Sequence, residues 1–192
     1  MSHNVPVLWL VARAAGLTAF LFLTLTVILG IAAGARSLPS WWPRFLTQGV
    51  HRGSSAVALL LLAVHVVTLV IDPYVVLTWT DIVIPFQAGY QRTWSALGTI
   101  AVDLLLVITL TSLVQLRVRL GPRLWRAIHV TSYAAWVVAL VHGLGAGTDT
   151  KMSAIKIAYA AAAGLVLIAF LIRTTRRPLR TGVRLTTAVG ER

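Results

Sequence analysis

Four of the five histidines in this 192-residue chain lie at regular intervals in two apolar segments. The first segment carries His51 and His65, which are 14 residues apart, and the second carries His129 and His142, which are 13 residues apart. Apolar segments that are long enough to cross a membrane rarely hold ionisable side chains without a functional reason. These two pairs are therefore the first candidates for a site that carries chemistry.

Imidazole is a common axial ligand of haem iron, and burial favours the neutral form that binds a metal. If the two segments are helices separated by one further membrane crossing, they run parallel. His51 then lies level with His129 near one membrane surface, and His65 lies level with His142 near the other. The chain has no cysteine, so a haem here is held without a covalent thioether link. The pattern predicts two haems b stacked across a membrane, with these four histidines as the iron ligands.

The two histidine spacings differ in helical geometry. Fourteen residues turn an ideal helix through about 1400°, roughly 40° short of four turns, so His51 and His65 share nearly one face. Thirteen residues fall about 140° short of four turns, so His129 and His142 do not share a face on a straight helix. Either that helix contains a bulge, such as the π-bulges found at functional sites, or the two haems approach it from different sides.

The composition is typical of an integral membrane protein. Hydrophobic residues make up 58% of the chain and charged residues 11%, whereas a soluble domain is about half apolar and about a quarter charged. Helices long enough to span roughly 30 Å of hydrocarbon are predicted near residues 7–34, 48–71, 94–116, 125–146 and 153–173. We therefore predict an all-α, five-helix transmembrane bundle, with a haem-binding transmembrane domain at residues 1–173 and a basic tail at residues 174–192.

The basic residues are divided unequally between the two sides of this bundle. Thirteen of the 17 lie on the side of the first and third loops and the C-terminal tail, namely Arg36, Arg44, Arg52, Arg117, Arg119, Arg123, Arg126, Arg173, Arg176, Arg177, Arg180, Arg184 and Arg192. By the positive-inside rule, the N-terminus is outside and the tail is cytoplasmic, in a multi-pass protein of the cell membrane. The net charge of +12 thus indicates contact with anionic membrane lipid, and no nucleic-acid partner is expected.

A rival interpretation makes the first segment a cleaved signal peptide, because Ala33-Gly34-Ala35 resembles a cleavage site. The apolar run is longer than that of a signal peptide, and the stretch before it is barely basic, so we favour a retained helix.

The longest loop, residues 72–93, is apolar enough to lie in the interface or to fold over the mouth of the bundle. Asp72 and Asp81 in this loop are expected to be solvated, because their spacing does not predict a metal site.

Two arginines are candidate cofactor-binding residues. Arg13 lies roughly two turns inside the first helix, where it either reaches back to the interface or pairs with a haem propionate or an anionic acceptor. Arg126 precedes His129 by three residues and shares its face. It either pairs with a propionate of the inner haem or anchors its helix at the cytoplasmic surface. The sequence leaves both choices open.

The histidine pairs and the VARAAG run around Arg13 resemble the ferric reductase-like transmembrane family. That family includes ferric reductases, the membrane domain of NADPH oxidases and the haem subunit of a bacterial methionine sulfoxide reductase system. The resemblance extends over roughly residues 7–173, and it implies a two-haem core with Arg13 beside the outer haem. The family usually has six helices, and its oxidases and ferric reductases carry a flavin and nicotinamide domain. This chain has five predicted helices and neither a dinucleotide fingerprint nor a phosphate loop.

We therefore expect a transmembrane b-type cytochrome that acts as the membrane subunit of an oxidoreductase. It would pass electrons from a separate donor protein or a quinol to an external electron acceptor. The alternative is a haem-binding membrane scaffold or sensor without catalysis. A transporter is a third interpretation, but the sequence lacks the interrupted helices in matched halves that transporters tend to have.

Overall fold

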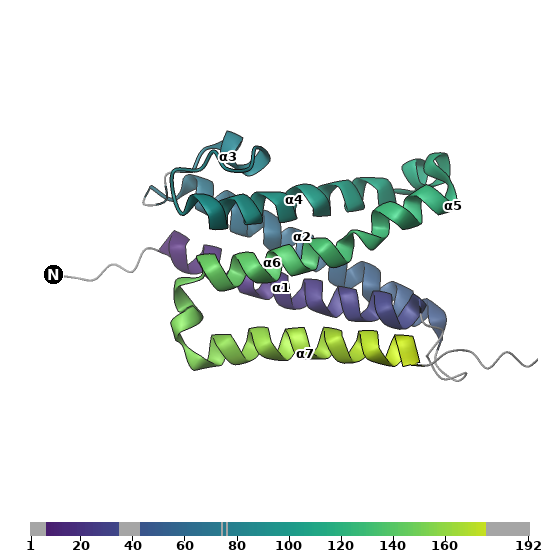
Figure 1. Cartoon of the computed structure of the whole chain (residues 1–192). Coiled ribbons are helices and arrows are strands. Elements are labelled where there is room, and N and C mark those ends of the chain that lie inside the picture. The colour runs from purple at the N-terminus through teal and green to yellow at the C-terminus, as the bar shows by residue number, and fades with distance from the viewer. Residues whose placement is uncertain (1–6, 35–42, 74, 76, 176–192) are drawn as a thin grey trace, which may run out of the picture.

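The computed structural model describes residues 7–34, 43–73, 75 and 77–175, and within these ranges the chain forms helices and no strands. The elements in chain order are α1 (Val7–Gly34), α2 (Arg44–Ile71), α3 (Trp79–Val83), α4 (Arg92–Ser112), α5 (Val114–Val130), α6 (Ser132–Ala146), the 3₁₀ helix η1 (Thr148–Lys151) and α7 (Ser153–Thr175). The long helices lie side by side in one bundle (Figure 1). Of the predicted basic tail, all but Thr174 and Thr175 lies outside the described residues.

Five helical stretches are long and apolar enough to cross a membrane: α1, α2, α4, the continuous stretch formed by α5 and α6, and α7. The prediction of an all-α bundle with five membrane helices is therefore confirmed. Large apolar side chains cover the surface, and Leu60, Ile157 and Leu165 are each more than half exposed. Such a surface is unfavourable in water and suits a lipid environment. The chain is a multi-pass membrane protein.

Helix α1 forms the centre of the bundle and packs against α2, α6 and α7. Its buried side chains recur three or four residues apart, so they form a stripe along one face. The stripe consists of Phe20, Leu23, Val27 and Ile31, and it packs with Trp136 of α6 in the main hydrophobic cluster. The indole Nε1 of Trp136 donates a hydrogen bond of 2.9 Å to the Thr24 hydroxyl, which ties α6 to α1.

Several helix boundaries differ from those predicted. Helix α2 begins at Arg44, one turn before the predicted start at residue 48. Helix α4 ends at Ser112, although the apolar pattern predicted a helix to residue 116. The hydroxyls of Thr111 and Ser112 donate hydrogen bonds of 2.7 Å to carbonyl oxygens four residues earlier. The chain leaves the helix at Leu113, whose φ of −60° and ψ of 140° are those of extended backbone.

The fourth membrane crossing is interrupted twice. Gly121 has a φ of 72°, a positive value that glycine tolerates, so a new helical stretch starts at Pro122. A second interruption separates α5 from α6 at Thr131, whose amide donates to the carbonyl oxygen of Ile128 at 3.0 Å. The sequence predicted one unbroken helix over residues 125–146, with a π-bulge as one option. The break is instead a tightened turn, because this hydrogen bond spans three residues rather than five.

The loop at residues 72–93 folds back onto the bundle. Its short helix α3 is capped by Thr78 and Asp81, which exchange hydrogen bonds in a capping box. The Thr99 hydroxyl of α4 donates to the carbonyl oxygen of Asp81 at 2.8 Å, which fixes α3 against α4. Asp81 is therefore a helix-capping residue rather than a freely solvated carboxylate.

We call the two ends of the bundle the α3 end and the α5 end, after a helix that lies at each. The α3 end carries α3, the start of α1 and the connection from α6 to η1 (Figure 1). The α5 end carries α5 and the C-terminal ends of α1 and α7 (Figure 1).

Candidate haem site

The structure brings the four histidines together as two pairs. His51 of α2 and His129 of α5 have ring centroids 6.2 Å apart, towards the α5 end. His65 of α2 and His142 of α6 have ring centroids 6.5 Å apart, towards the α3 end. These are the two pairs that the matched depths predicted.

The separation of the rings fits a metal ion between each pair. A first-row metal ion binds an imidazole nitrogen at about 2.0–2.1 Å, and the ring centroid lies about 1.1 Å beyond that nitrogen, so opposed axial imidazoles have centroids about 6.3 Å apart. The measured separations of 6.2 and 6.5 Å lie on either side of this value. Each pair is therefore spaced to supply two axial ligands to one iron.

A single cavity of about 1300 Å³ connects the two pairs, and all four histidines line it. The rest of its lining is largely apolar and comes mainly from α1, α2, α4, α5 and α6. Val75, Leu77 and Ile82 of the folded loop, the short helix η1 and two residues of α7 also contribute. Pockets for one drug-sized molecule measure about 300–1,000 Å³. This cavity is large enough for more than one flat, apolar group.

Three of the four imidazoles are oriented by backbone carbonyl oxygens. Nδ1 of His51 donates to Thr26 at 2.9 Å, Nδ1 of His65 to Ala12 at 2.7 Å, and Nδ1 of His142 to Trp94 at 2.7 Å. A carbonyl oxygen only accepts, so each of these Nδ1 atoms carries the proton. Nε2 is then left as the metal-binding nitrogen, in the arrangement usual for histidine ligands.

His129 is held differently. Its Nδ1 is buried and has no hydrogen-bond partner among the described residues. The ring instead stacks on Trp125, with centroids 4.9 Å apart and planes inclined by 24°. The guanidinium of Arg117 lies over the Trp125 ring, 4.0 Å from its centroid. Aromatic and cation–π contacts thus fix this ring where a carbonyl oxygen fixes the other three.

Glycines make room for two of the histidine rings. A Cβ at Gly16 would lie 2.7 Å from Nδ1 of His65, and a Cβ at Gly98 would lie 2.7 Å from Cε1 of His142. Both distances are well inside normal van der Waals contact, so only glycine allows the rings to lie this close to α1 and α4. Gly30 borders His51 more loosely, at 3.5 Å.

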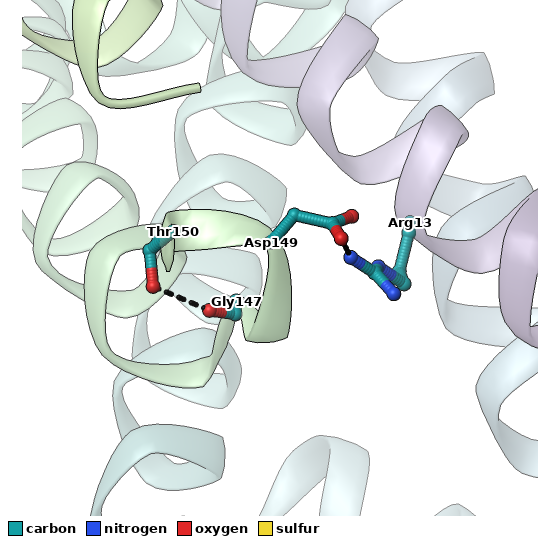
Figure 2. A network of polar contacts seen from close by, with 4 residues as sticks. All are labelled: Arg13, Gly147, Asp149 and Thr150. Carbon is teal, nitrogen blue, oxygen red and sulfur yellow. Dashed lines mark hydrogen bonds and ion pairs between the residues drawn. The ribbon is translucent and has the colours of Figure 1, made fainter. Parts of the chain in front are cut away.

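Arg13 lies at the α3 end and lines the cavity. Its guanidinium forms an ion pair with Asp149 of η1 (Figure 2), and it lies over the Trp9 ring, 5.5 Å from the centroid. Its neighbour Ala12 supplies the carbonyl oxygen that orients His65. Arg13 therefore borders the cavity at the same end as the His65–His142 pair.

Arg126 lies outside the cavity lining and is exposed. Two other arginines, Arg52 and Arg117, line the cavity at the α5 end. Arg126 and His129 share a helix face by spacing, but the arginine of α5 that lines the cavity is Arg117. It lies in the part of α5 that precedes the break at Gly121.

Several residues that shape the site could not be recognised from the sequence alone: Arg117, Asp149, Gly16, Gly98 and Trp125. A carboxylate partner for Arg13 could be anticipated, because a partly buried arginine needs one. The sequence offers three aspartates near that end, Asp72, Asp81 and Asp149, and spacing does not choose among them. The glycines carry no sequence signal, because their importance depends on which ring packs against them.

Within the described ranges, no group of three or more His, Cys, Asp or Glu residues is arranged to hold a metal ion. The site is thus built from pairs, and a bare metal ion would need further ligands. The four equatorial nitrogens of a porphyrin provide such ligands. The donor set therefore fits haem iron better than a structural zinc site, which takes four protein ligands.

Comparison with family models gives one match over more than half of the chain. The family is described as the ferric reductase like transmembrane component, and the match covers residues 15–140. This range includes His51, His65 and His129, while Arg13 and His142 lie just beyond its two ends. Comparison with curated proteins and with solved structures gives no match.

Proposed function

This chain belongs to the ferric reductase-like transmembrane family, and we propose that it is a transmembrane b-type cytochrome. In this proposal it passes electrons from a donor on the cytoplasmic side to an acceptor on the outer side. The observation that carries the proposal is the pair of histidine separations, 6.2 and 6.5 Å, at two levels of one apolar cavity.

The four histidines would hold two haems b, His51 with His129 and His65 with His142. Haem b supplies a one-electron redox centre when it is bound, so two such centres at different depths would span much of the membrane. The backbone carbonyl oxygens of Ala12, Thr26 and Trp94 fix the tautomer and direction of three ligands. The largely apolar lining suits the macrocycle of a haem.

The orientation follows from the arginines. Those described at the α5 end are Arg44, Arg52, Arg117, Arg119, Arg123, Arg126 and Arg173. The positive-inside rule then assigns the α5 end to the cytoplasm of a cell membrane. The His51–His129 pair would lie towards the donor and the His65–His142 pair towards the acceptor. A membrane potential that is negative inside favours outward movement of an electron by about 2.3 kcal/mol per 100 mV.

The donor would be a separate protein or a membrane quinol, and the acceptor a molecule on the outer side. The cavity lining at the α5 end includes Arg52, Arg117 and Trp125. The two guanidinium groups can donate hydrogen bonds to an anionic haem propionate, and the arginines and the indole ring also suit the approach of an electron-donor molecule.

The test is a spectrum of the purified protein in detergent, oxidised and then reduced with dithionite. The proposal requires low-spin b-type bands and, by pyridine haemochrome assay, two haems per chain. A protein that is folded, by its helical circular dichroism, but binds no haem after expression with added haem precursor would contradict it. One haem per chain would restrict the proposal to a single histidine pair.

A further inference from the structure

The ion pair between Arg13 and Asp149 joins α1, whose backbone orients His65, to η1, which follows the helix that carries His142. Arg13 follows Ala12 in α1, and the carbonyl oxygen of Ala12 accepts the hydrogen bond from His65. Asp149 lies in η1, directly after α6, the helix that carries His142. Figure 2 shows the two side chains pointing towards one another from α1 and η1.

The short helix η1 is held in a defined position, so Asp149 is presented to Arg13 by an ordered backbone. The Thr150 hydroxyl donates to the carbonyl oxygen of Gly147 at 2.7 Å (Figure 2). The amide of Met152 donates to the carbonyl oxygen of Asp149 at 2.8 Å, and the amide of Gly147 donates to Gly143 at 3.2 Å.

Both partners are partly withdrawn from solvent. The side chain of Arg13 is 24% exposed and that of Asp149 is 41% exposed, and both residues line the cavity. Charges that border a low-dielectric cavity are screened less than charges on an open surface. An unpaired arginine here would place a positive charge beside the His65–His142 level.

We propose that Asp149 is a positioning residue that holds the Arg13 guanidinium at the level of His65 and His142 and neutralises its charge there. The inference rests on the proposed function, because the group that would respond to these charges is a haem held by this histidine pair. Asp149 lies outside the helices that carry the histidines. The sequence left open whether Arg13 reaches the interface or pairs with a haem propionate, and the structure gives Arg13 a protein partner, Asp149.

The sign of the effect follows from electrostatics. A positive charge favours the form of a nearby redox centre that carries the extra electron, and a negative charge disfavours it. Removing the charge of Asp149 leaves Arg13 uncompensated and should raise the midpoint potential of the haem at the α3 end. Removing the charge of Arg13 leaves Asp149 uncompensated and should lower that potential. Removing both charges should return the potential close to the wild-type value.

The experiment is a spectroelectrochemical titration of the haem-loaded protein in detergent. The proteins compared are wild type, Asp149→Asn, Arg13→Gln and the double variant, and Lys151→Gln serves as a matched control. Lys151 lies in the same short helix as Asp149, but it is exposed and does not line the cavity. We expect opposite shifts in the two single variants, a near-wild-type potential in the double variant and a small shift in the control.

Shifts of the same sign in the two single variants, or a double variant whose potential stays as far from the wild-type value as that of a single variant, would overturn the role of Asp149. So would a Lys151→Gln shift as large as that of Asp149→Asn, because the effect would then come from surface charge at the α3 end in general. If Asp149→Asn does not accumulate, Asp149→Glu keeps the charge and should hold the wild-type potential. An altered potential in that variant counts against the inference.

The haem content of the wild-type protein is measured first, and its absence would contradict the proposed function alone. In that case, the thermal unfolding of the same four haem-free proteins tests the ion pair. A double-mutant cycle with no coupling between Arg13 and Asp149 would overturn the positioning role independently of any cofactor.

Discussion

His65 donates a hydrogen bond of 2.7 Å from Nδ1 to the carbonyl oxygen of Ala12, one helical turn from Gly16, whose missing side chain leaves room for the ring. A carbonyl oxygen and a glycine on successive turns of α1 thus fix both the direction and the position of this imidazole. His142 has the same arrangement on α4, where Trp94 supplies the carbonyl oxygen and Gly98 the space. The α3-end pair is therefore seated against two helix backbones.

Gly16→Ala and Gly98→Ala should each lower the haem content at the α3 end. The new Cβ would lie 2.7 Å from His65 Nδ1 or from His142 Cε1, so the ring must move and its iron bond weaken. The measurement is haem stoichiometry with the reduced spectrum of each variant. Gly164→Ala is the matched control, because its Cβ meets nothing within 4 Å and alanine favours a helix by roughly 0.5–1 kcal/mol. Full haem content in both site variants would show that the rings are not fixed as described.

The two haems should be lost separately. His65→Ala or His142→Ala should remove one haem and leave the other with its low-spin spectrum, and His51→Ala or His129→Ala should do the converse. Pyridine haemochrome assays combined with redox titration distinguish the two cases, because the surviving haem keeps its own midpoint potential. Loss of the same haem in His65→Ala and His129→Ala would refute the pairing, and two unchanged haems in any variant would exclude that histidine as a ligand.

The sequence predicted the pairing of the histidines because depth in a membrane is a one-dimensional quantity. At about 1.5 Å per residue, spacings of 14 and 13 residues on parallel helices give two matched levels. The direction of each imidazole ring could not be predicted from the sequence. It depends on carbonyl oxygens of α1 and α4, such as those of Ala12 and Trp94, and only the tertiary structure brings these oxygens near the rings.

The helix count was predictable from hydropathy, whereas the interruptions were predictable only in part. Gly121-Pro122 signals a break through backbone chemistry, but Thr131 carries no such signal, because threonine is common inside membrane helices. Arg126 illustrates the consequence. Its spacing from His129 predicted a shared face, yet the break at Gly121 brings Arg117 to the cavity instead.

Trp136 should contribute to stability and have little influence on the haem spectra. It is buried, stacks on Phe20 and donates to the Thr24 hydroxyl, but it does not line the cavity. Trp136→Phe removes this hydrogen bond, whose net value is about 0.5–1.5 kcal/mol, together with part of the packed ring. Thermal unfolding in detergent should show a lower midpoint with unchanged reduced spectra. Trp79→Phe, at a position 61% exposed, should change the midpoint little, and an equal loss there would remove the special role of Trp136.

A reporter fused after Arg192 should be active only in the cytoplasm. Thirteen of the 17 basic residues are predicted to lie on the side of the bundle that includes the C-terminal tail, and positively charged loops are retained on the cytoplasmic side. Paired alkaline phosphatase and fluorescent protein fusions measure the two possible outcomes. A second pair of fusions after Gly89, in the connection between α3 and α4, should give the opposite result. Phosphatase activity of the Arg192 fusion would reverse the assignment of donor and acceptor ends.

The break at Thr131 should set the rotation of His142 relative to His129. On a straight helix these residues would face directions about 140° apart, and the tightened turn at Thr131 lets each face its partner on α2. One alanine inserted between Thr131 and Ser132 would turn α6 by about 100° and shift it by about 1.5 Å. This variant should lose the haem held by His65 and His142 and keep the haem held by His51 and His129, as measured by haem stoichiometry and redox titration. An alanine inserted after Gly89 should keep both haems, because Gly89 is exposed and the length of this connection does not set the register of any histidine helix. If the Thr131 insertion retained two low-spin haems, the register of α6 would not determine ligation, and the geometric basis of the α3-end site would be wrong.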